Sequence, residues 1–394
     1  MNIYIMKRRI WIIAAVCLAV LAGAGMVVLS VVPRYDYILP ALRYRIPKID
    51  HYPLFGRAVV LAGDPQPWPY APGVATARIP DSVEAAFAGY ETTAYLVVKD
   101  GEIVLEQYWD GYADTLWSNS FSMAKSVVSL LVGCAIDDGY IHSVEQPVAD
   151  FLPGDWAWRS EPLRIRDLLT MSAGFQWDES AASLFSPTTQ IYYGGDLAAI
   201  LYRTRFKEKP GVHFEYQSGV TQLLAMVLTS AVGRPLSDYA SEKLWRPLGA
   251  EEDAIWSTDD KGVEKAFCCF NSNARDFARI GQLILQHGRW NGVPLVDSAY
   301  VCAATTPADY LRFGDQACTF YGYQFWIADL RGHTMPYCRG ILGQYIIVVP
   351  DENMVVVRLG RSRSEERDAA QDYTLDLELW VNTALDMFGS SSNQ

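Results

Sequence analysis

The chain has few histidines, and none of them belongs to a recognisable cluster of metal ligands. Its 394 residues include five histidines, which stand isolated along the sequence. No spacing of cysteines and histidines matches a zinc site. The scattered histidines argue against a metal centre and against a Ser-His-Asp triad. We therefore expect no metal and no other cofactor.

Long basic stretches, internal repeats and low-complexity tracts are also lacking. The net charge of −12 makes nucleic acid an improbable partner, because phosphate backbones attract positively charged surfaces. Half of the residues are hydrophobic and a fifth are charged. A chain of this length and composition can bury a large core, as one big domain or two tightly packed lobes.

The N-terminus contains a long uncharged run. Basic residues 7–9 precede uncharged residues 10–32, and a run of that length can cross a bilayer as a helix. Basic residues on the short side favour a cytoplasmic N-terminus and a periplasmic remainder. A cleaved signal peptide is the alternative, since residues 22–24 resemble a small-residue cleavage site. The length favours an uncleaved single-pass anchor in the inner membrane, after a cytoplasmic segment at 1–9.

Export would place six cysteines in an oxidising compartment, where disulfides form. Six cysteines allow fifteen pairings, and the sequence does not choose among them. Cys318 and Cys338 flank a predicted turn around Gly332, so a bridge between them is one interpretation. Buried free thiols are the other.

The order of predicted elements indicates an α+β fold with two lobes. Proline-rich residues 33–60 predict a stalk before a domain at 61–390. Apolar runs bounded by turn residues predict strands at 93–98, 102–108, 344–349 and 354–359. Helical spacing is found at 163–172, 221–232, 274–286 and 373–387. We therefore predict an antiparallel sheet, flanked by helices and built from both ends of the chain, with an inserted all-α lobe at about 118–262.

The most informative motif is the pair Ser122 and Lys125. Two residues separate them, so on a helix their side chains project from the same face. A serine hydroxyl needs a neighbouring base to become a nucleophile. The apolar stretch 127–132 follows directly, which indicates a buried helix with Lys125 near its N-terminal end. Burial favours the neutral amine of a lysine, which can then act as a general base.

Two later segments fit the same site. Tyr216 precedes the apolar helix at 221–232 and could relay protons, although packing is the simpler interpretation of one tyrosine among 23. Gly340 stands at the edge of a predicted strand, where glycine lets another backbone approach closely. A backbone N–H there, together with that of Ser122, could form an oxyanion hole.

At these residues the chain resembles the serine hydrolases related to class C β-lactamases, DD-peptidases and 6-aminohexanoate-dimer hydrolases. That family uses Ser-x-x-Lys, then Tyr-x-Asn or Tyr-x-Ser, then a Lys-Thr-Gly-like strand motif. Ser122 and Lys125 match the first motif, and Tyr216 and Ser218 match the second. Segments 167–174 and 273–281 are similar too. Residues 191–194 resemble the 6-aminohexanoate-dimer-hydrolase and esterase branch.

The resemblance implies a role for each matching position. Ser122 would be the acylated nucleophile, Lys125 its base and Tyr216 the proton relay to the leaving group. The N–H groups of Ser122 and Ile341 would hold the oxyanion. Water would then release the acyl group, so the substrate expected is a small amide or ester.

The third motif departs from the family pattern, because Cys338, Arg339 and Gly340 stand where Lys-Thr-Gly is expected. Arg339 could replace the missing ammonium, but its planar guanidinium is not equivalent. An amide or ester hydrolase therefore fits better than a β-lactamase. A D-aminopeptidase or DD-carboxypeptidase remains an alternative, as does a penicillin-recognising sensor that has lost turnover.

Three aromatic residues are candidates for the acyl pocket, although packing explains them equally well: Tyr192, Tyr193 and Trp177. Arg275 and Asp276 stand at a helix start and predict a structural ion pair. The sequence leaves the oligomeric state open.

Overall fold

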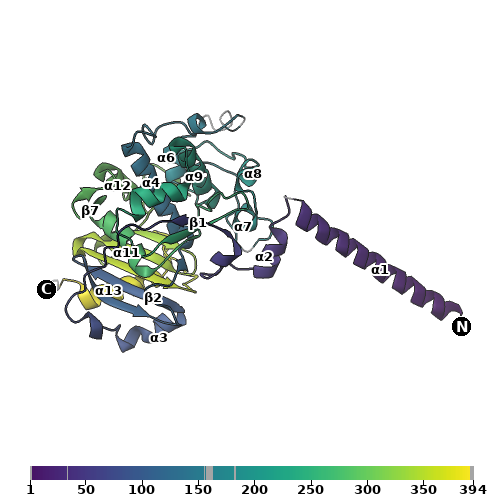
Figure 1. Ribbon diagram of the computed structural model, residues 1–394, viewed down its shortest axis with the longest axis horizontal. Helices are drawn as coiled ribbons and strands as arrows, with labels where there is room; N and C mark the ends of the chain where they lie inside the picture. Colours follow the sequence, from purple (N-terminus) through teal and green to yellow (C-terminus); the bar gives the residue numbers. More distant parts are fainter. Residues whose placement is uncertain (1, 33, 155, 157–162, 182, 391–394) are drawn as a thin grey trace.

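A six-stranded antiparallel sheet joins the two ends of the chain (Figure 1). The computed structural model describes residues 2–32, 34–154, 156, 163–181 and 183–390. The strand order is β11-β12-β13-β14-β2-β3, so β14 from the end of the chain pairs with β2 from its first third. The bounds are β2 Thr92–Lys99, β3 Glu102–Tyr108, β11 Trp326–Leu330, β12 His333–Gly340, β13 Gln344–Val349 and β14 Met354–Gly360. The antiparallel sheet predicted from both ends is confirmed.

Helices cover both faces of this sheet. Strands buried on both sides form continuous apolar runs, and every residue of β13 and β14 is buried. On one face, α11 (Ala274–Leu285) brings Gly281 against Val355 and Ile346. On the other, α13 (Asp376–Phe388) accepts a hydrogen bond from Tyr95 of β2 at the Trp380 carbonyl, 2.6 Å away, and α3 (Asp81–Gly89) packs nearby.

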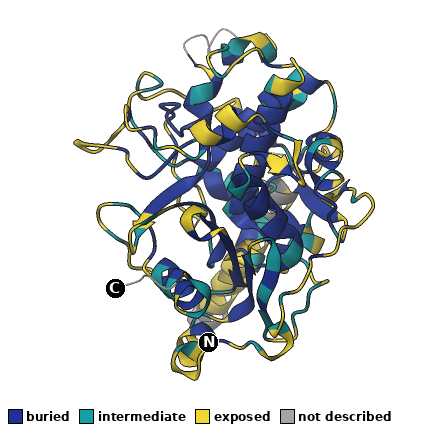
Figure 2. Ribbon diagram, turned by 90° about the vertical axis from the view of Figure 1, so that its left-hand side faces the viewer, coloured by how far each residue is buried: buried dark blue, intermediate teal, exposed yellow. Residues whose placement is uncertain are grey.

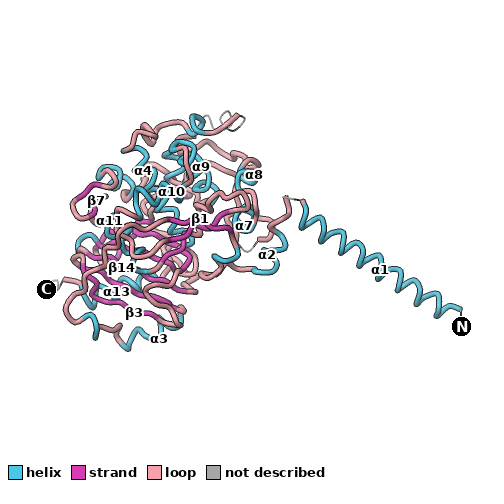
Figure 3. Tube along the Cα trace, viewed as in Figure 1, coloured by secondary structure: helices cyan, strands magenta, loops and turns pink. Residues whose placement is uncertain are grey.

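The helical lobe lies between the halves of the sheet in sequence and beside it in space (Figure 3). At its centre, α4 (Ala124–Asp137) packs against α9 (Ser218–Val232), and most residues of both helices are buried. Figure 2 shows this buried interior in dark blue. The helix predicted at 163–172 is shorter, because Met171 adopts a φ of 56°. The lobe's shorter helices are α6 Ile165–Leu169, α7 Pro187–Tyr193, α8 Leu197–Leu201 and α10 Leu236–Ala240, and α12 (Ser298–Ala304) contacts α4.

A second sheet crosses this lobe, so the prediction of an all-α lobe is wrong. Its four strands have the order β1-β5-β6-β4. Their bounds are β1 Gly56–Val60, β4 Ser118–Asn119, β5 Ala254–Thr258 and β6 Phe270–Ser272. β4 leads into the turn that carries Ser122, and the segment after β5 reaches the same site. This small sheet therefore supports the segments that carry Ser122 and Phe267.

The N-terminal helix α1 (Asn2–Val31) projects away from the rest of the molecule (Figure 1). Among the described residues, no helix is long and apolar enough to cross a membrane, so the structure does not support the predicted span. Pro33 lies outside the described residues. The segment predicted as a stalk contains α2 (Ile38–Tyr44), the 3₁₀ turn Tyr52–Leu54 and β1.

That segment is hydrogen-bonded to the helical lobe. The Tyr193 hydroxyl donates to the Arg45 carbonyl at 3.0 Å. The Gly195 N–H donates to Asp36 Oδ2, also at 3.0 Å. Residues 34–55 therefore contribute to the surroundings of α7 and of the pocket described below.

One disulfide is present among the described residues, between the adjacent Cys268 and Cys269. Cys318 and Cys338 are buried free thiols, so a bridge across their hairpin is the wrong one of the two interpretations. Burial raises the pKa of each of these thiols to about 12, which keeps them protonated and unreactive at neutral pH.

Candidate active site

Ser122 lies in the turn that opens α4. Phe121 has a positive φ of 44°, and its N–H is held by the Asn119 side chain at 2.8 Å. A 3₁₀ turn over Phe121–Met123 then continues into α4. β12 approaches this turn closely, because a Cβ on Gly340 would lie 2.3 Å from the Ser120 carbonyl oxygen. The glycine expected to allow a close approach does so here, toward the turn that carries Ser122.

Lys125 is buried beside Ser122, one helical turn further on. Its side-chain Nζ lies 2.9 Å from Ser122 Oγ, 2.7 Å from the Phe267 carbonyl oxygen and 3.3 Å from Ser218 Oγ. The residue is only 1% exposed. No carboxylate contacts the Nζ directly among these partners. Three oxygens thus surround a nitrogen that has almost no access to bulk water.

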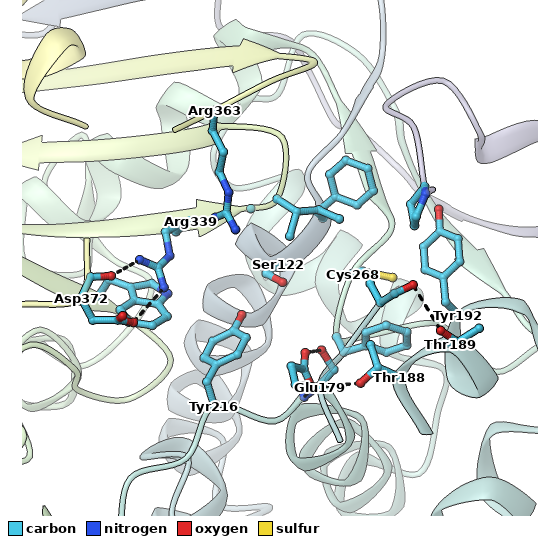
Figure 4. Close-up of a pocket in the computed structure, with 18 of the residues that line it drawn as sticks. Ser122, Glu179, Thr188, Thr189, Tyr192, Tyr216, Cys268, Arg339, Arg363 and Asp372 are labelled. Carbon is cyan, nitrogen blue, oxygen red and sulfur yellow. Dashed lines mark hydrogen bonds and ion pairs between the residues drawn. The ribbon is translucent and has the colours of Figure 1, made fainter. Parts of the chain in front are cut away.

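Tyr216, the third residue predicted for the site, lies close to Ser122 and Lys125. It precedes α9, and its hydroxyl points toward Ser122 in Figure 4. The Lys125 Nζ lies 5.0 Å from the centroid of its ring. The ring also packs on Trp326 at 5.3 Å between centroids. Two motifs that are distant in sequence therefore converge on one point.

Ser122 and Tyr216 line a cavity of about 410 Å³, the size of a small-molecule site. Figure 4 shows two unlike sides around Ser122, with Arg339, Arg363 and Asp372 on one side and Tyr192 and Thr189 on the other. Gly340, Ile341 and Tyr193 also line the cavity. Burial raises the pKa of Tyr193 to about 12, so its phenol is neutral.

Trp177 does not line the cavity, contrary to its predicted role. It is buried behind the wall, with ring atoms as close as 2.4 Å to where a Cβ on Gly219 would lie. Its indole N–H donates to Glu179 Oε2 and to Thr188 Oγ1, both at 2.9 Å. Trp177 therefore supports two residues that do line the cavity.

Arg339 is engaged within the protein. It donates to the Asp372 carbonyl at 2.6 Å and is stacked on Trp326. Asp372 also forms an ion pair with Arg367, whose Nη1 lies 2.8 Å from each carboxylate oxygen. Arg339 is therefore poorly placed to replace the lysine of the family motif, since its planar group is held by these partners.

Arg363 lines the same side and was not singled out from the sequence. Among the described residues it has no hydrogen-bond or ion-pair partner, and Figure 4 shows its guanidinium directed toward Ser122. Burial and the nearby guanidiniums of Arg339 and Arg367 lower its pKa. Its place three residues after the end of β14 was the only available signal. The structure thus presents an unpaired cation to the cavity.

Glu179 was also missed, because it lies in an irregular segment. Its Oε1 accepts from the Ser218 hydroxyl at 2.5 Å, and its Oε2 accepts from the Ser218 N–H at 2.7 Å. Ser218 in turn contacts Lys125. A carboxylate is thereby connected to the Ser122–Lys125 pair through one hydroxyl.

The predicted ion pair between Arg275 and Asp276 is wrong. Asp276 binds Arg279 at 3.0 Å and accepts from the Glu251 N–H at 2.8 Å. Arg275 binds Glu106 at 2.7 Å instead. Arg275 and Asp276 each form a structural ion pair, but with other partners than each other.

No group of three or more histidine, cysteine or acidic side chains suited to a metal ion occurs within the described ranges. A serine beside a buried lysine, in a cavity between an antiparallel sheet and a helical lobe, is the arrangement of a serine hydrolase. The chain belongs to the β-lactamase family, whose profile matches residues 81–379.

Relatives within this family differ in what they are said to hydrolyse. The 6-aminohexanoate-dimer hydrolase of Paenarthrobacter ureafaciens is 26% identical over 304 residues, covering 72% of this chain and 75% of that protein. A protein of Escherichia coli K12 assigned as a D-alanyl-D-alanine carboxypeptidase is 26% identical over 189 residues, covering 41% of this chain and 42% of its own.

Solved structures show the same fold at lower identity. A Bacillus anthracis protein assigned as a 6-aminohexanoate-dimer hydrolase has a TM-score of 0.73 at 21% identity, covering 88% of this chain and 94% of its own. A D-stereospecific amidohydrolase from Streptomyces has a TM-score of 0.58 at 15% identity, covering 78% and 97%. These likenesses confirm the α+β architecture.

Proposed function

We propose that the protein hydrolyses small amides or esters through an acyl-enzyme on Ser122. One observation carries the proposal: the buried Nζ of Lys125 lies 2.9 Å from Ser122 Oγ at the cavity surface. The distance is within hydrogen-bond reach of the proton that a general base must remove. The amide hydrolase among the relatives supports the reaction type.

The proposed reaction has two stages. Lys125 takes the Ser122 proton while Oγ attacks the substrate carbonyl, and the N–H groups of Ser122 and Ile341 hold the oxyanion. Tyr216 passes a proton to the leaving amine or alkoxide, which departs as the acyl-enzyme forms. Water then attacks the ester carbonyl, and Ser122 recovers its proton as the acid is released.

The charge of the cavity narrows the substrate class. The half-buried guanidinium of Arg363 has no hydrogen-bond or ion-pair partner among the described residues, so it favours an anionic group, and a carboxylate can bind it through two parallel hydrogen bonds. The opposite side presents the aromatic rings of Tyr192 and Tyr193, and the Glu179 carboxylate there is already engaged by Ser218. The proposed substrate therefore has a carboxylate near the scissile bond on the Arg363 side and an uncharged chain on the other.

Cell-wall-type peptides are a second candidate, for the same reason. Peptides ending in D-alanine have a free carboxylate next to the scissile amide, which Arg363 would suit. Part of the chain matches the Escherichia coli protein assigned as a carboxypeptidase. A sensor that recognises penicillin would use the same serine without turnover.

Labelling with a fluorophosphonate probe tests the proposal, followed by turnover of p-nitrophenyl esters, anilides, penicillin and D-alanyl-D-alanine peptides. Labelling that Ser122→Ala abolishes, with ester or anilide turnover, supports the hydrolase. Turnover of D-alanyl peptides alone supports the second candidate. A stable penicilloyl adduct without turnover indicates the sensor, and wild-type labelling in Ser122→Ala overturns all three.

We also propose, from the sequence alone, that the N-terminal segment exports the domain and anchors it in the inner membrane. Basic residues 7–9 and the uncharged residues 10–32 support this topology. Protease added to spheroplasts should degrade the domain while sparing a cytoplasmic marker. Protection of the domain in intact spheroplasts, with degradation only after lysis, would contradict the proposal.

A further inference from the structure

Four side chains form a continuous chain of contacts that begins at the nucleophile. Ser122 Oγ lies 2.9 Å from Lys125 Nζ, which lies 3.3 Å from Ser218 Oγ, which lies 2.5 Å from Glu179 Oε1. The Phe267 carbonyl oxygen, 2.7 Å from the Nζ, is the remaining neighbour. All four contacts are hydrogen bonds, of which the one between Lys125 and Ser218 is the longest. The direction of each hydrogen bond then follows from what the groups can donate.

The direction at Ser218 is set by Glu179. A hydroxyl has one proton to donate, whereas an ionised carboxylate only accepts. The single proton of Ser218 therefore goes to Glu179, and its oxygen is left to accept from Lys125. The Phe267 carbonyl can likewise only accept. Two of the positions around the Lys125 nitrogen must consequently hold N–H groups.

The remaining position faces Ser122. A neutral amine has two N–H groups and one lone pair, so with both N–H groups engaged the lone pair is directed at the Ser122 hydroxyl. After the proton moves, the ammonium has three N–H groups for the same three oxygens. The surroundings therefore suit both the base and its protonated form, without rearrangement.

We propose that Glu179 is a positioning residue, which aims the Lys125 lone pair at Ser122 by fixing the direction of the Ser218 hydrogen bond. The proposal rests on the function proposed above, because it concerns how Ser122 is activated. Glu179 needs no contact with the substrate for this role. Its own position is held by two N–H donors at Oε2, from Trp177 at 2.9 Å and from Ser218 at 2.7 Å.

Glu179→Gln reverses one hydrogen bond while preserving the shape of the side chain. The two N–H donors at the Oε2 position require the carbonyl oxygen of glutamine, which leaves its NH₂ facing Ser218 Oγ. That NH₂ must donate, so the Ser218 proton turns toward Lys125 and competes with Ser122 for the lone pair. Substitution by glutamine should therefore impair acylation rather than binding.

The experiment measures fluorophosphonate labelling of the full chain at several probe concentrations. We expect Glu179→Gln to lower the maximal labelling rate at least about tenfold. General acid–base catalysis supplies roughly 10²–10⁴-fold, and a misdirected lone pair would lose part of that factor. The half-saturating probe concentration should stay within about twofold. Glu208→Gln, at a glutamate that binds His213, is the matched control and should label like the wild type.

A double-mutant cycle separates positioning from a loss of structure. Ser218→Ala removes the hydroxyl but keeps the backbone N–H that Glu179 binds, so Glu179→Gln should change the rate less than about twofold in that background. An equal loss in both backgrounds overturns the proposal, as does no loss in the wild type. If Lys125→Ala labels at the wild-type rate, the proposed function fails instead, so the two failures are distinguishable.

Discussion

The guanidinium carbon of Arg339 lies 3.4 Å from the centroid of the Trp326 ring. Cation–π stacking of this kind holds the side chain in one orientation, and Arg339 is buried as well. Arg339, which stands in the family's third motif, is thus a fixed part of the cavity wall. The carboxylate of the proposed substrate would therefore bind another cation, and Arg363 lines the same side of the cavity.

Arg363→Ala should raise KM for p-nitrophenyl esters that have a carboxylate. A charge-assisted hydrogen bond contributes about 1.5–3 kcal/mol, which corresponds to roughly 10- to 100-fold in KM. Neutral esters of equal length should change less than about twofold. Steady-state kinetics on matched charged and neutral esters check this outcome.

Arg361→Ala is the control for this prediction, because Arg361 follows the same strand but pairs with Asp110 at 3.0 Å. It should leave both ester classes unaffected. An equal effect of Arg363→Ala on charged and neutral esters would show that Arg363 supports the wall and binds no anion.

Gly340→Ala should slow acylation strongly. The added Cβ would lie 2.3 Å from the Ser120 carbonyl oxygen, so β12 or the turn before Ser122 must shift. Displacements of about 1 Å at an active site can cost on the order of 100-fold in rate. Fluorophosphonate labelling measures the loss, and a thermal melt verifies the fold. Gly89→Ala, with open space around it, should match the wild type, and unchanged labelling in Gly340→Ala would refute the packing argument.

Lys265 predicts a pH dependence of stability. Burial lowers its pKa from 10.5 to about 8, while Asp259 opposes the shift. Between pH 8 and 10.5 the unfolded chain binds a proton that the folded protein does not, so stability rises with pH across this window. The cost of the buried charge is fully present below pH 8.

The measurement compares the free energy of unfolding of the wild type with that of Lys265→Met. Because both proteins contain the same other titratable groups, the difference between them reports on Lys265 alone. The free energy of unfolding of the wild type should increase relative to the variant by about 3 kcal/mol from pH 8 to 10.5. A difference that stays constant over this window would show that Lys265 remains charged in the folded protein and that burial does not lower its pKa.

Thiol titration tests the cysteine assignment. The unfolded protein without reductant should expose five reactive thiols, and reduction should release two more from the Cys268–Cys269 pair. In the folded protein the exposed Cys17 and Cys302 should react first. A count of three or fewer in the unfolded protein would mean that further disulfides form.

The sequence predicted those elements whose hydrophobic pattern is long and bounded by turns. β13 has the predicted bounds, and β14 is one residue longer than predicted. α9 begins at Ser218 rather than at residue 221, because its first turn faces the cavity and lacks the apolar pattern. β4 and β6, with two and three residues, are too short to have a detectable period, so the second sheet could not be foreseen.

The site residues also differ in how far the sequence could predict them. Ser122 and Lys125 belong to one local motif, and the helix geometry brings them together. Glu179 and Arg363 come from irregular segments, where tertiary packing alone decides which side chains reach the cavity. Trp177 was misplaced for a related reason, since an aromatic residue near a site can either line it or support the residues that do.

The pairing of β14 with β2, in which Met354 lies opposite Lys99, has a consequence for biosynthesis. The ribosome synthesises β2 and β3 long before β14, their partner strand. The edge of this hairpin that later pairs with β14 therefore stays unpaired while the helical lobe is translated. Non-local pairing of this kind is slow and exposes nascent chains to aggregation. A chain that stops before residue 354 should therefore depend on chaperones or be degraded, even though it already contains Ser122, Lys125 and Tyr216.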